Sequence, residues 1–401
     1  MVPTPRHVGH HLQLLQGSGA FFSALVQAMD GSLHEVRLET YIFRLDAGGE
    51  QVFQALERAA GRGVNVCVVV DGVGTPALPQ AWAARLAAAG AQWRVFSPLG
   101  RLGLLVPSRW RRLHRKLCVV DGQVAFCGGI NVLDDWVDPN HGALEAPRFD
   151  FAVRVTGPLV QEVHATMSQF WWRLQATQLA KQVDWLGAWQ ALQQAVHEKA
   201  QKSSGQMAAG AAQAQLVLRD NLRFRSRIER AYRQAFGDAR RDIIVANAYF
   251  LPGRKIRNSL MHAAKRGVRV RLLLQGRYEY FMQYHAARAL YGPLLAAGIE
   301  IYEYTPSFLH AKVAVVDGRW ATVGSSNMDP LSLLLAREAN VVVQDEPFAR
   351  GLQHCLELAI DADTHQIDAA RHAERGLRLR LFDRLAYLLM RMFLFVNGKR
   401  Y

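Results

Sequence analysis

A set of polar residues occurs twice in this chain at the same internal spacing. The first copy, HRKLCVVDGQVAFCGGIN, runs from His114 to Asn131, and the second, HAKVAVVDGRWATVGSSN, runs from His310 to Asn327. In each copy a Lys follows the His by two residues, an Asp by seven, a Gly by fourteen and an Asn by seventeen. Packing alone does not demand the same polar spacing at two distant places. The chain is therefore predicted to be a duplication that carries half of a functional site in each copy.

The sequence around the two motifs repeats as well. AAGRGVNVCVVV at Ala59–Val70 matches AAKRGVRVRLLL at Ala263–Leu274, and a strand expected at Glu35–Phe43 corresponds to one at Asp242–Phe250. Strands that alternate with helices predict βαβ units, and continuous apolar runs indicate strands covered on both faces. Each motif is typical of two strands joined by Asp-Gly, a strong hairpin signal. We expect an α/β fold of two tandem domains, each a mixed, largely parallel sheet flanked by helices, with the active site at the interface of the halves.

The expected domain boundaries follow from chain length and local composition. A chain of 401 residues is too long for one ordinary core. Residues 199–215, KAQKSSGQMAAGAAQAQ, are small and polar, which is typical of a linker or mobile loop. We therefore expect an N-terminal domain over residues 1–198, a C-terminal domain over 216–365, and a basic amphipathic tail over 366–401.

The residue types that recur in the motif suit chemistry on a phosphodiester. An imidazole can attack phosphorus or donate a proton to a leaving oxygen. A lysine ammonium and an Asn amide can hold phosphate oxygens. One His would attack while the other protonates the departing alkoxide, and the lysines would stabilise charge on the non-bridging oxygens. The expected catalytic residues are His114, Lys116, Asn131, His310, Lys312 and Asn327.

The two motif acids, Asp121 and Asp317, are expected to have a structural role. Seven residues along a straight strand, at about 3.3 Å each, would place Asp121 roughly 23 Å from His114. Each Asp should instead lie at the far turn of its hairpin, where Asp is a favoured residue.

A nucleophilic His needs an acceptor on its second ring nitrogen to hold the tautomer. Candidates should follow each motif on the next strand, and there Asp150 lies in RFDFAVRV and Glu338 in REANVVV. Glu338 follows His310 by 28 residues and Asp150 follows His114 by 36, so the first copy carries about eight extra residues. We place these around Asp138–Leu144. Asp150 and Glu338 are expected to orient the histidines; the alternative is that each is a surface charge at a strand end.

No metal or other cofactor is expected at this site. The chain has no CxxC spacing and no Gly-rich phosphate loop of the Walker type. Two lysines in one pocket would also oppose a divalent cation. The net charge of +14 favours anionic partners, which include nucleic acid, anionic lipid headgroups and phosphate-bearing substrates.

The pattern HxK(x)4D(x)6G[GS]xN, present twice, resembles the paired HKD motifs of the phospholipase D superfamily. Within it, the chain is most similar to the short bacterial cardiolipin synthases of type B, through LETYIF, NAYFLPG, KRGVRVRLLLQG and HAKVAVVDGRWATVGSSNMDP. One departure is Gly129-Ile130, where the second copy has Ser325-Ser326. The resemblance implies two phospholipase D-like domains and the same orienting role for Asp150 and Glu338.

The resemblance also implies a metal-independent, two-step exchange. His114 would form a phosphatidyl-histidine intermediate, with His310 as acid and base. The free hydroxyl of phosphatidylglycerol would then displace the histidine and give cardiolipin. The phosphatidyl donor, phosphatidylglycerol or phosphatidylethanolamine, is left open, as is the oligomeric state.

Two other functions are compatible with such a site. A phospholipase D-type phosphodiesterase or nuclease would hydrolyse phospholipid or nucleic acid, with the positive charge binding the latter. A non-catalytic binding protein would not need a complete set of His, Lys and Asn in both copies. A nuclease has no evident need for the hydrophobic tail, so nucleic acid is the less favoured partner.

The tail offers a surface for docking on a membrane. Leu385–Val396 is apolar except for Arg391, and basic residues flank it. It is too short to span a bilayer but could lie in the interface and attract anionic lipid. The alternative is a C-terminal helix packed on the protein core. We expect a peripheral protein on the cytoplasmic face of the bacterial inner membrane, docked by Arg378, Arg380, Arg384, Leu385, Leu388, Leu389 and Phe393.

Overall fold

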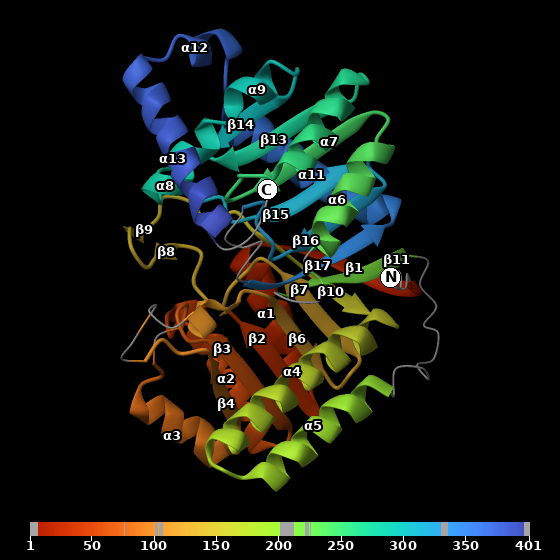
Figure 1. Ribbon diagram of the computed structural model, residues 1–401. Helices are drawn as coiled ribbons and strands as arrows, with labels where there is room; N and C mark the ends of the chain where they lie inside the picture. The colour runs from red at the N-terminus through yellow and green to blue at the C-terminus, as the bar shows by residue number, and fades with distance from the viewer. Residues whose placement is uncertain are drawn as a thin grey trace. The chain divides into compact units, whose positions relative to one another are not determined.

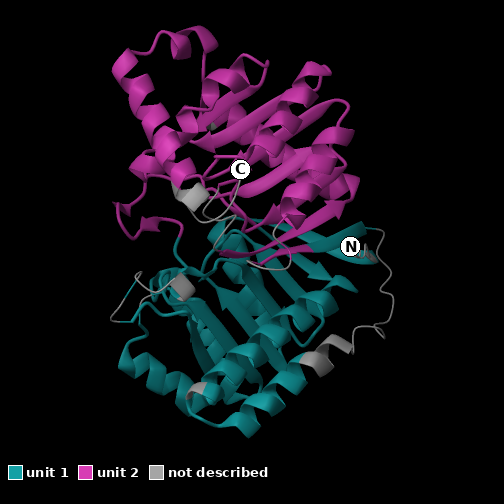
Figure 2. Cartoon of the chain, viewed as in Figure 1, with its two compact units in different colours: residues 1–134, 152–216 teal, residues 135–151, 217–401 magenta. Residues whose placement is uncertain are grey.

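A computed structural model describes residues 7–75, 77–100, 103, 107–200, 212–220, 224, 226–329 and 336–396. The chain forms two compact units, which Figure 2 colours separately. Unit 1 comprises residues 1–134 and 152–216, and unit 2 comprises residues 135–151 and 217–401. This division departs from sequence order in one respect, because residues 135–151 follow the first motif but pack in unit 2. Most of the linker expected over residues 199–215 lies outside the described residues, and a strand begins at Ala212.

The sheet of unit 1 has the strand order β11-β1-β10-β7-β6-β2-β3-β4 (Figure 1). Residues 212–216 of β11 belong to this unit. The pairs β2–β3 and β3–β4 are parallel, whereas β2–β6, β6–β7 and β7–β10 are antiparallel. The strands are β1 (His7–Gln16), β2 (Glu35–Thr40), β3 (Asn65–Asp71), β4 (Gln92–Phe96), β5 (Arg112–Leu113), β6 (Lys116–Val120), β7 (Val124–Gly128), β10 (Phe151–Thr156) and β11 (Ala212–Arg219).

Helices cover both faces of the unit 1 sheet. Side chains alternate along β3, so that Val68 packs in a core with α1 and α2, while Val69 packs with Phe170 of α4 on the opposite face. The second helix begins at a clear signal, because the Asp46 carboxylate accepts a hydrogen bond from Gly49 N at 3.0 Å. The helices are α1 (Gly17–Asp30), α2 (Ala47–Gly61), α3 (Gln80–Ala89), the short 3₁₀ helix η2 (Pro107–Trp110), α4 (Leu159–Lys181) and α5 (Trp185–Ala200).

The sheet of unit 2 repeats this plan in the order β18-β14-β13-β12-β15-β16-β17. The pairs β12–β13 and β13–β14 are parallel, and the motif strands β15 and β16 are antiparallel to their neighbours. The strands are β12 (Asp242–Asn247), β13 (Arg269–Gln275), β14 (Glu300–Tyr304), β15 (Lys312–Val316), β16 (Trp320–Gly324), β17 (Ala336–Gln344) and β18 (Thr364–Gln366), with a separate pair β8 (Val137–Asp138) and β9 (Gly142–Ala143). The helices are α6 (Arg227–Asp238), α7 (Arg254–Lys265), α8 (Phe281–Arg288), α9 (Tyr291–Leu295), α11 (Glu346–Asp363), α12 (Ala369–Ala373) and α13 (Leu377–Val396).

The predicted α/β fold, with one motif in each of two repeated units, is confirmed. β2 pairs with β6 in unit 1 as β12 pairs with β15 in unit 2, so each motif follows the same topology. Each motif forms the predicted hairpin, β6–β7 or β15–β16. The turn residues Asp121 and Gly122 both have positive φ, 50° and 63°, and Asp317 and Gly318 have 53° and 65°. Two successive positive φ values are the hallmark of the tight hairpin turn that Asp-Gly favours.

The C-terminal helix α13 packs against α8 within unit 2. Ala386 and Met390 are buried in the core of this unit, while Leu385 and Leu388 on another face are 50% and 56% exposed. Among the described residues, no helix combines the length and the apolar character needed to cross a membrane.

Candidate active site

In unit 1 the start of strand β6 positions the first His and Lys of the pattern. Lys116 is the first residue of β6 and is 4% exposed, and its Nζ donates to the carbonyl oxygen of His114 at 2.7 Å. The ring of Tyr41 lies 5.0 Å from the His114 ring and 5.5 Å from Lys116 Nζ, measured to the ring centroid. An ammonium is attracted to the face of an aromatic ring. Sequence reasoning missed Tyr41, although it stands in LETYIF directly after β2; the second copy has Ala248 at the corresponding place.

The two motif Asn residues are both buried just after the hairpins. Asn131 Oδ1 accepts a hydrogen bond from Ile42 N at 3.2 Å, which fixes the amide against the segment after β2. Asn327 is 2% exposed, and its Oδ1 has no hydrogen-bond partner among the described residues.

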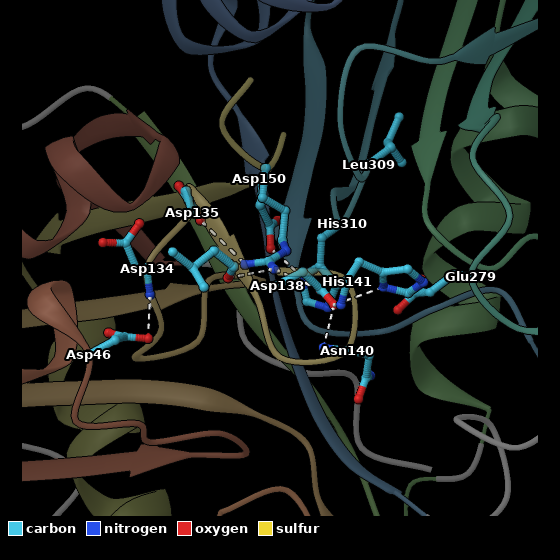
Figure 3. A network of polar contacts seen from close by, with 12 residues as sticks. Asp46, Asp134, Asp135, Asp138, Asn140, His141, Asp150, Glu279, Leu309 and His310 are labelled. Atoms are coloured by element: carbon cyan, nitrogen blue, oxygen red, sulfur yellow. Dashed lines mark hydrogen bonds and ion pairs between the residues drawn. The ribbon is translucent and has the colours of Figure 1, made fainter. Parts of the chain in front are cut away.

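In unit 2 a carboxylate contacts the second motif His. Asp150 Oδ2 lies 2.6 Å from His310 Nδ1, and the Asp150 side chain is almost completely buried (Figure 3). Backbone hydrogen bonds hold the two segments together, since His310 N donates to Phe149 O at 2.9 Å and Phe149 N donates to Phe308 O at 3.0 Å. The carboxylate is itself fixed, because its Oδ1 accepts from Phe151 N at 2.8 Å.

The sequence predicts that Asp150 and Glu338 orient the histidines, without assigning either acid to one of them. In the structure Asp150 contacts His310, the His of the other copy, because residues 135–151 pack in unit 2. With a carboxylate on Nδ1, the Nε2 atom of His310 is the nitrogen able to give or take a proton.

Lys312, two residues after His310, is fully buried. Its Nζ donates to the carbonyl oxygen of His310, as Lys116 does to His114. Burial lowers the pKa of Lys312 to about 8, although the negative charges of Asp150, Glu338 and Glu279 act in the opposite direction. The ammonium is thus present at neutral pH but close to losing its proton, and a bound phosphate anion would favour the charged form. Among the described residues, no group of three or more His, Cys, Asp or Glu side chains could hold a metal ion.

Glu338, the counterpart of Asp150 in the second copy, is also completely buried. Its Oε2 accepts a hydrogen bond from Ser325 Oγ, and the same hydroxyl accepts from Ala339 N at 3.1 Å. The first copy has Gly129 at the position of Ser325 and therefore lacks this hydroxyl. Glu338 therefore has a hydroxyl donor from its own motif, and the first motif has no equivalent hydroxyl to donate to Asp150.

The extra residues of the first copy form a polar hairpin beside the second motif. They lie where the count placed them, in the β8–β9 pair, and Arg148 contacts Asp138 at 3.0 Å within this segment. His141 Nδ1 lies 2.9 Å from Asp138 (Figure 3). The His141 ring packs 4.9 Å from that of Phe308, two residues before the motif His. Glu279, also in unit 2, accepts a hydrogen bond from the Tyr249 hydroxyl at 2.8 Å. The insertion was visible in the sequence, but its packing against the second motif was not.

The two motif acids bind backbone rather than the histidines. Asp121 accepts hydrogen bonds from the N–H groups of residues 33, 34 and 35, each at 2.8 Å. Asp317 accepts the equivalent three from residues 240, 241 and 242 at 2.8 to 2.9 Å. Burial opposes ionisation of these carboxylates, but the three N–H donors more than offset it and hold the pKa of each below its usual value. Each Asp therefore joins its hairpin turn to the start of the strand that pairs with the hairpin in the sheet, β2 for Asp121 and β12 for Asp317.

Comparisons with known proteins agree with this geometry. The family model described as "Cardiolipin synthase, PLD-like domain" matches residues 25–171 and 232–357. Cardiolipin synthase B of Escherichia coli (strain K12) is 39% identical over 369 residues, which cover 90% of this chain and 83% of that protein. A cardiolipin synthase of Geobacillus kaustophilus (strain HTA426) is 31% identical over 372 residues, which cover 92% of this chain and 69% of that protein.

A solved structure shows the same fold at low sequence identity. The phosphatidylserine synthase of Haemophilus influenzae matches with a TM-score of 0.66 and 11% identity, over 98% of this chain and 95% of that one. At this identity the likeness concerns the fold alone. The two regions matched by the family model each contain one HKD motif, and the resemblance drawn from the motifs is confirmed. The chain belongs to the family of phospholipase D-like cardiolipin synthases.

Proposed function

We propose that this chain makes cardiolipin by transferring a phosphatidyl group to phosphatidylglycerol at a membrane surface. Its family is one of phosphatidyl-transferring enzymes of the phospholipase D superfamily, and the relatives named above are cardiolipin synthases. The observation that carries the proposal is the contact between Asp150 and His310, whose backbone carbonyl accepts a hydrogen bond from the buried Lys312. The carboxylate orients the imidazole and the lysine supplies a cation two residues away, and proton transfer at a phosphodiester can use both.

The reaction has two displacement steps at phosphorus. In the first, a ring nitrogen of His114 attacks the donor phosphodiester, the bond from phosphorus to the headgroup oxygen breaks, and His310 gives that oxygen its proton. In the second, His310 takes the proton from the free hydroxyl of phosphatidylglycerol, whose oxygen bonds to phosphorus as the histidine leaves. The products are cardiolipin and the headgroup alcohol, which is glycerol or ethanolamine according to the donor.

The remaining motif residues would serve charge and orientation. Lys116 and Lys312 would stabilise the non-bridging oxygens, and the amides of Asn131 and Asn327 would add neutral donors. Asp150 would orient His310 through the 2.6 Å contact. Glu338 is proposed as the second orienting acid because it is the counterpart of Asp150 and equally buried.

The membrane surface would be met by the C-terminal helix α13. Its side chains Arg378, Arg380 and Arg384 are exposed, and so are Leu385, Leu388 and Leu389. Phe393, the last of the expected docking residues, is one whose side chain the structure does not describe. The helix packs on unit 2 with one face and exposes apolar side chains on another, and this exposed apolar face supports the proposed docking. We place the protein peripherally on the cytoplasmic face of the bacterial inner membrane.

A lipid product assay tests the proposal against hydrolysis and nuclease activity. Purified protein would be incubated with phosphatidylglycerol vesicles, with and without phosphatidylethanolamine, and the lipids followed by mass spectrometry. The wild type is expected to form cardiolipin and the His114→Ala variant is expected to form none. The donor is identified by comparing the cardiolipin yield with and without phosphatidylethanolamine. Phosphatidic acid alone would indicate a hydrolase. Absence of both products, with cleavage of single-stranded DNA, would refute phosphatidyl transfer.

A further inference from the structure

A cavity of about 310 Å³ in unit 2 is lined by residues of α9, α12 and α13, three helices that Figure 1 labels. None of the motif residues lines it. Its walls come from the end of α8, from α9, from α12 and from the first turns of α13. The charged or titratable residues in the lining are Arg288, His372, Arg375, Arg380, Asp383 and Arg384.

The lining carries an excess of positive charge. Asp383 is its one carboxylate and is already engaged, since it contacts His285 Nδ1 at 2.8 Å and Arg375 at 2.9 Å. Arg288 is paired with Glu303 at 2.7 Å. Arg380 and Arg384, by contrast, make no ion pair with any residue that the structure describes. Two guanidinium groups are therefore available to an anion at the cavity.

The state of His372 is consistent with this positive field. Burial and the charges of Arg375, Arg288 and Arg380 lower its pKa to about 4, with Asp383 acting in the opposite direction. The neutral ring accepts a hydrogen bond on Nε2 from Arg375 at 2.8 Å. Because Nε2 accepts this bond, the neutral ring carries its proton on Nδ1, and the lining has one neutral donor besides its guanidinium groups.

The outer face of α13 adds hydrocarbon next to these arginines. A set of apolar side chains recurs every three or four residues and is 50% to 80% exposed; it comprises Leu377, Leu381, Leu385, Leu388 and Met392. At about 100° per residue they form one stripe, which points away from the core-facing Ala386 and Met390. Arg380 and Arg384 fall between the buried face and this apolar stripe. An anion that carries acyl chains would satisfy both surfaces, whereas free phosphate would leave the stripe without a partner.

We propose that this arginine cavity binds the phosphate headgroup of an anionic phospholipid, held by Arg380 and Arg384, with acyl chains along the apolar stripe of α13. This inference rests on the proposed function at a membrane surface, and it assigns membrane docking to one defined cavity. It differs from attraction by diffuse charge, in which every exposed arginine of the tail would count equally.

Two charge-matched double variants separate these possibilities. Arg380→Gln/Arg384→Gln removes two positive charges from the cavity, and Arg371→Gln/Arg378→Gln removes two from exposed positions nearby that do not line it. Binding is measured by co-sedimentation with vesicles of phosphatidylcholine and phosphatidylglycerol, and with phosphatidylcholine alone. Thermal unfolding of each variant checks that both pairs fold.

The cavity pair should lose at least about tenfold more affinity for the anionic vesicles than the control pair, because it also loses charge-assisted hydrogen bonds. Equal losses in the two pairs would overturn the proposal. A phosphatidylglycerol with a photoreactive headgroup should crosslink to peptides of α12 and α13 in the wild type and not in the cavity pair. Crosslinks confined to other peptides would also overturn it.

Competition with soluble anions shows whether the cavity binds the phosphate of a lipid or free phosphate. Inorganic phosphate and glycerol phosphate should compete only weakly with the photoreactive lipid, and competition as strong as that of short-chain phosphatidylglycerol would overturn the assignment to lipid. Cardiolipin formation is measured in parallel on detergent-dispersed phosphatidylglycerol. If the cavity pair loses affinity selectively but the protein forms no cardiolipin, the proposed function is refuted and the lipid-binding cavity stands. If the protein forms cardiolipin but the two pairs lose affinity equally, the cavity proposal is refuted and the proposed function stands.

Discussion

Replacing Asp150 by Asn removes the charge that faces His310 while keeping the size of the side chain. The Asp150 carboxylate lies 2.6 Å from His310 Nδ1 and is 1% exposed, so water does not replace it readily. An Asn can present either its oxygen or its NH₂ group to the ring, and the second choice favours the wrong tautomer. The variant should therefore fold but transfer protons poorly.

The size of the effect follows from the kind of hydrogen bond that is lost. A hydrogen bond to a charged group contributes about 1.5–3 kcal/mol, which corresponds to a rate loss of roughly 10- to 150-fold if it is made only in the transition state. The same substitution removes one of the negative charges that favour protonation of Lys312. The alkaline limb of the rate profile should consequently move to lower pH in Asp150→Asn.

The leaving group of the substrate reports which step His310 serves. A phosphodiester with p-nitrophenol as leaving group needs little protonation, whereas an alkyl headgroup needs a general acid. The burst of p-nitrophenol, which reports formation of the histidine adduct, should fall by much less in Asp150→Asn than single-turnover release of an alkyl headgroup.

The control for this experiment is Asp317→Asn, the same chemical change at an acid that binds backbone. It should leave the ratio between the two leaving groups at the wild-type value. Equal losses for both substrates in Asp150→Asn, or full activity with both, would refute an orienting role of Asp150 in proton transfer.

Three further outcomes follow from the structure. The rate of the wild type should fall as pH rises through about 8, because Lys312 loses its charge there, and Lys312→Arg should flatten that limb; an unchanged limb in the variant would assign it to another group. Asp317→Asn should lower the free energy of unfolding by about 1–2 kcal/mol at neutral pH, measured by chemical denaturation. Because the pKa of Asp317 is lowered in the folded state, the wild type should lose this stability as pH falls through that pKa, whereas the variant has none of it to lose. If the free energy of unfolding fell with pH in the same way in both proteins, the hydrogen-bonded role of Asp317 would be contradicted. Leu385→Gln/Leu388→Gln should weaken vesicle binding without lowering thermal stability, because both side chains are exposed; deleting the whole helix is a poorer test, since it would uncover the core around Ala386.

The features that sequence could predict are those set by local spacing. The hairpin turns at Asp121 and Asp317 depend on two adjacent residues, and the duplication is written in the repeated strands and motifs. For the same reason the apolar and basic pattern of residues 366–401 was sufficient to predict an amphipathic tail. Each of these properties belongs to a short stretch of chain.

The partner of Asp150 could not be predicted because it depends on the path of residues 135–151. Spacing along the chain does not show which unit this segment joins; it packs in unit 2, where Phe149 pairs with Leu309. Tyr41 was missed for a different reason: an aromatic residue after a strand fits a buried core as well as it fits a site. Only its position beside the His114 ring separates the two.

The most direct test of the account is to trap the covalent intermediate. Protein mixed with phosphatidylglycerol would be quenched within one turnover in alkaline denaturant, which preserves a phosphorus–nitrogen bond, and digested for mass spectrometry. We predict a phosphatidyl adduct on the peptide that contains His114, absent in His114→Ala and retained in His310→Ala when the leaving group is p-nitrophenol. An adduct on the His310 peptide, or cardiolipin formed without any histidine adduct, would contradict it.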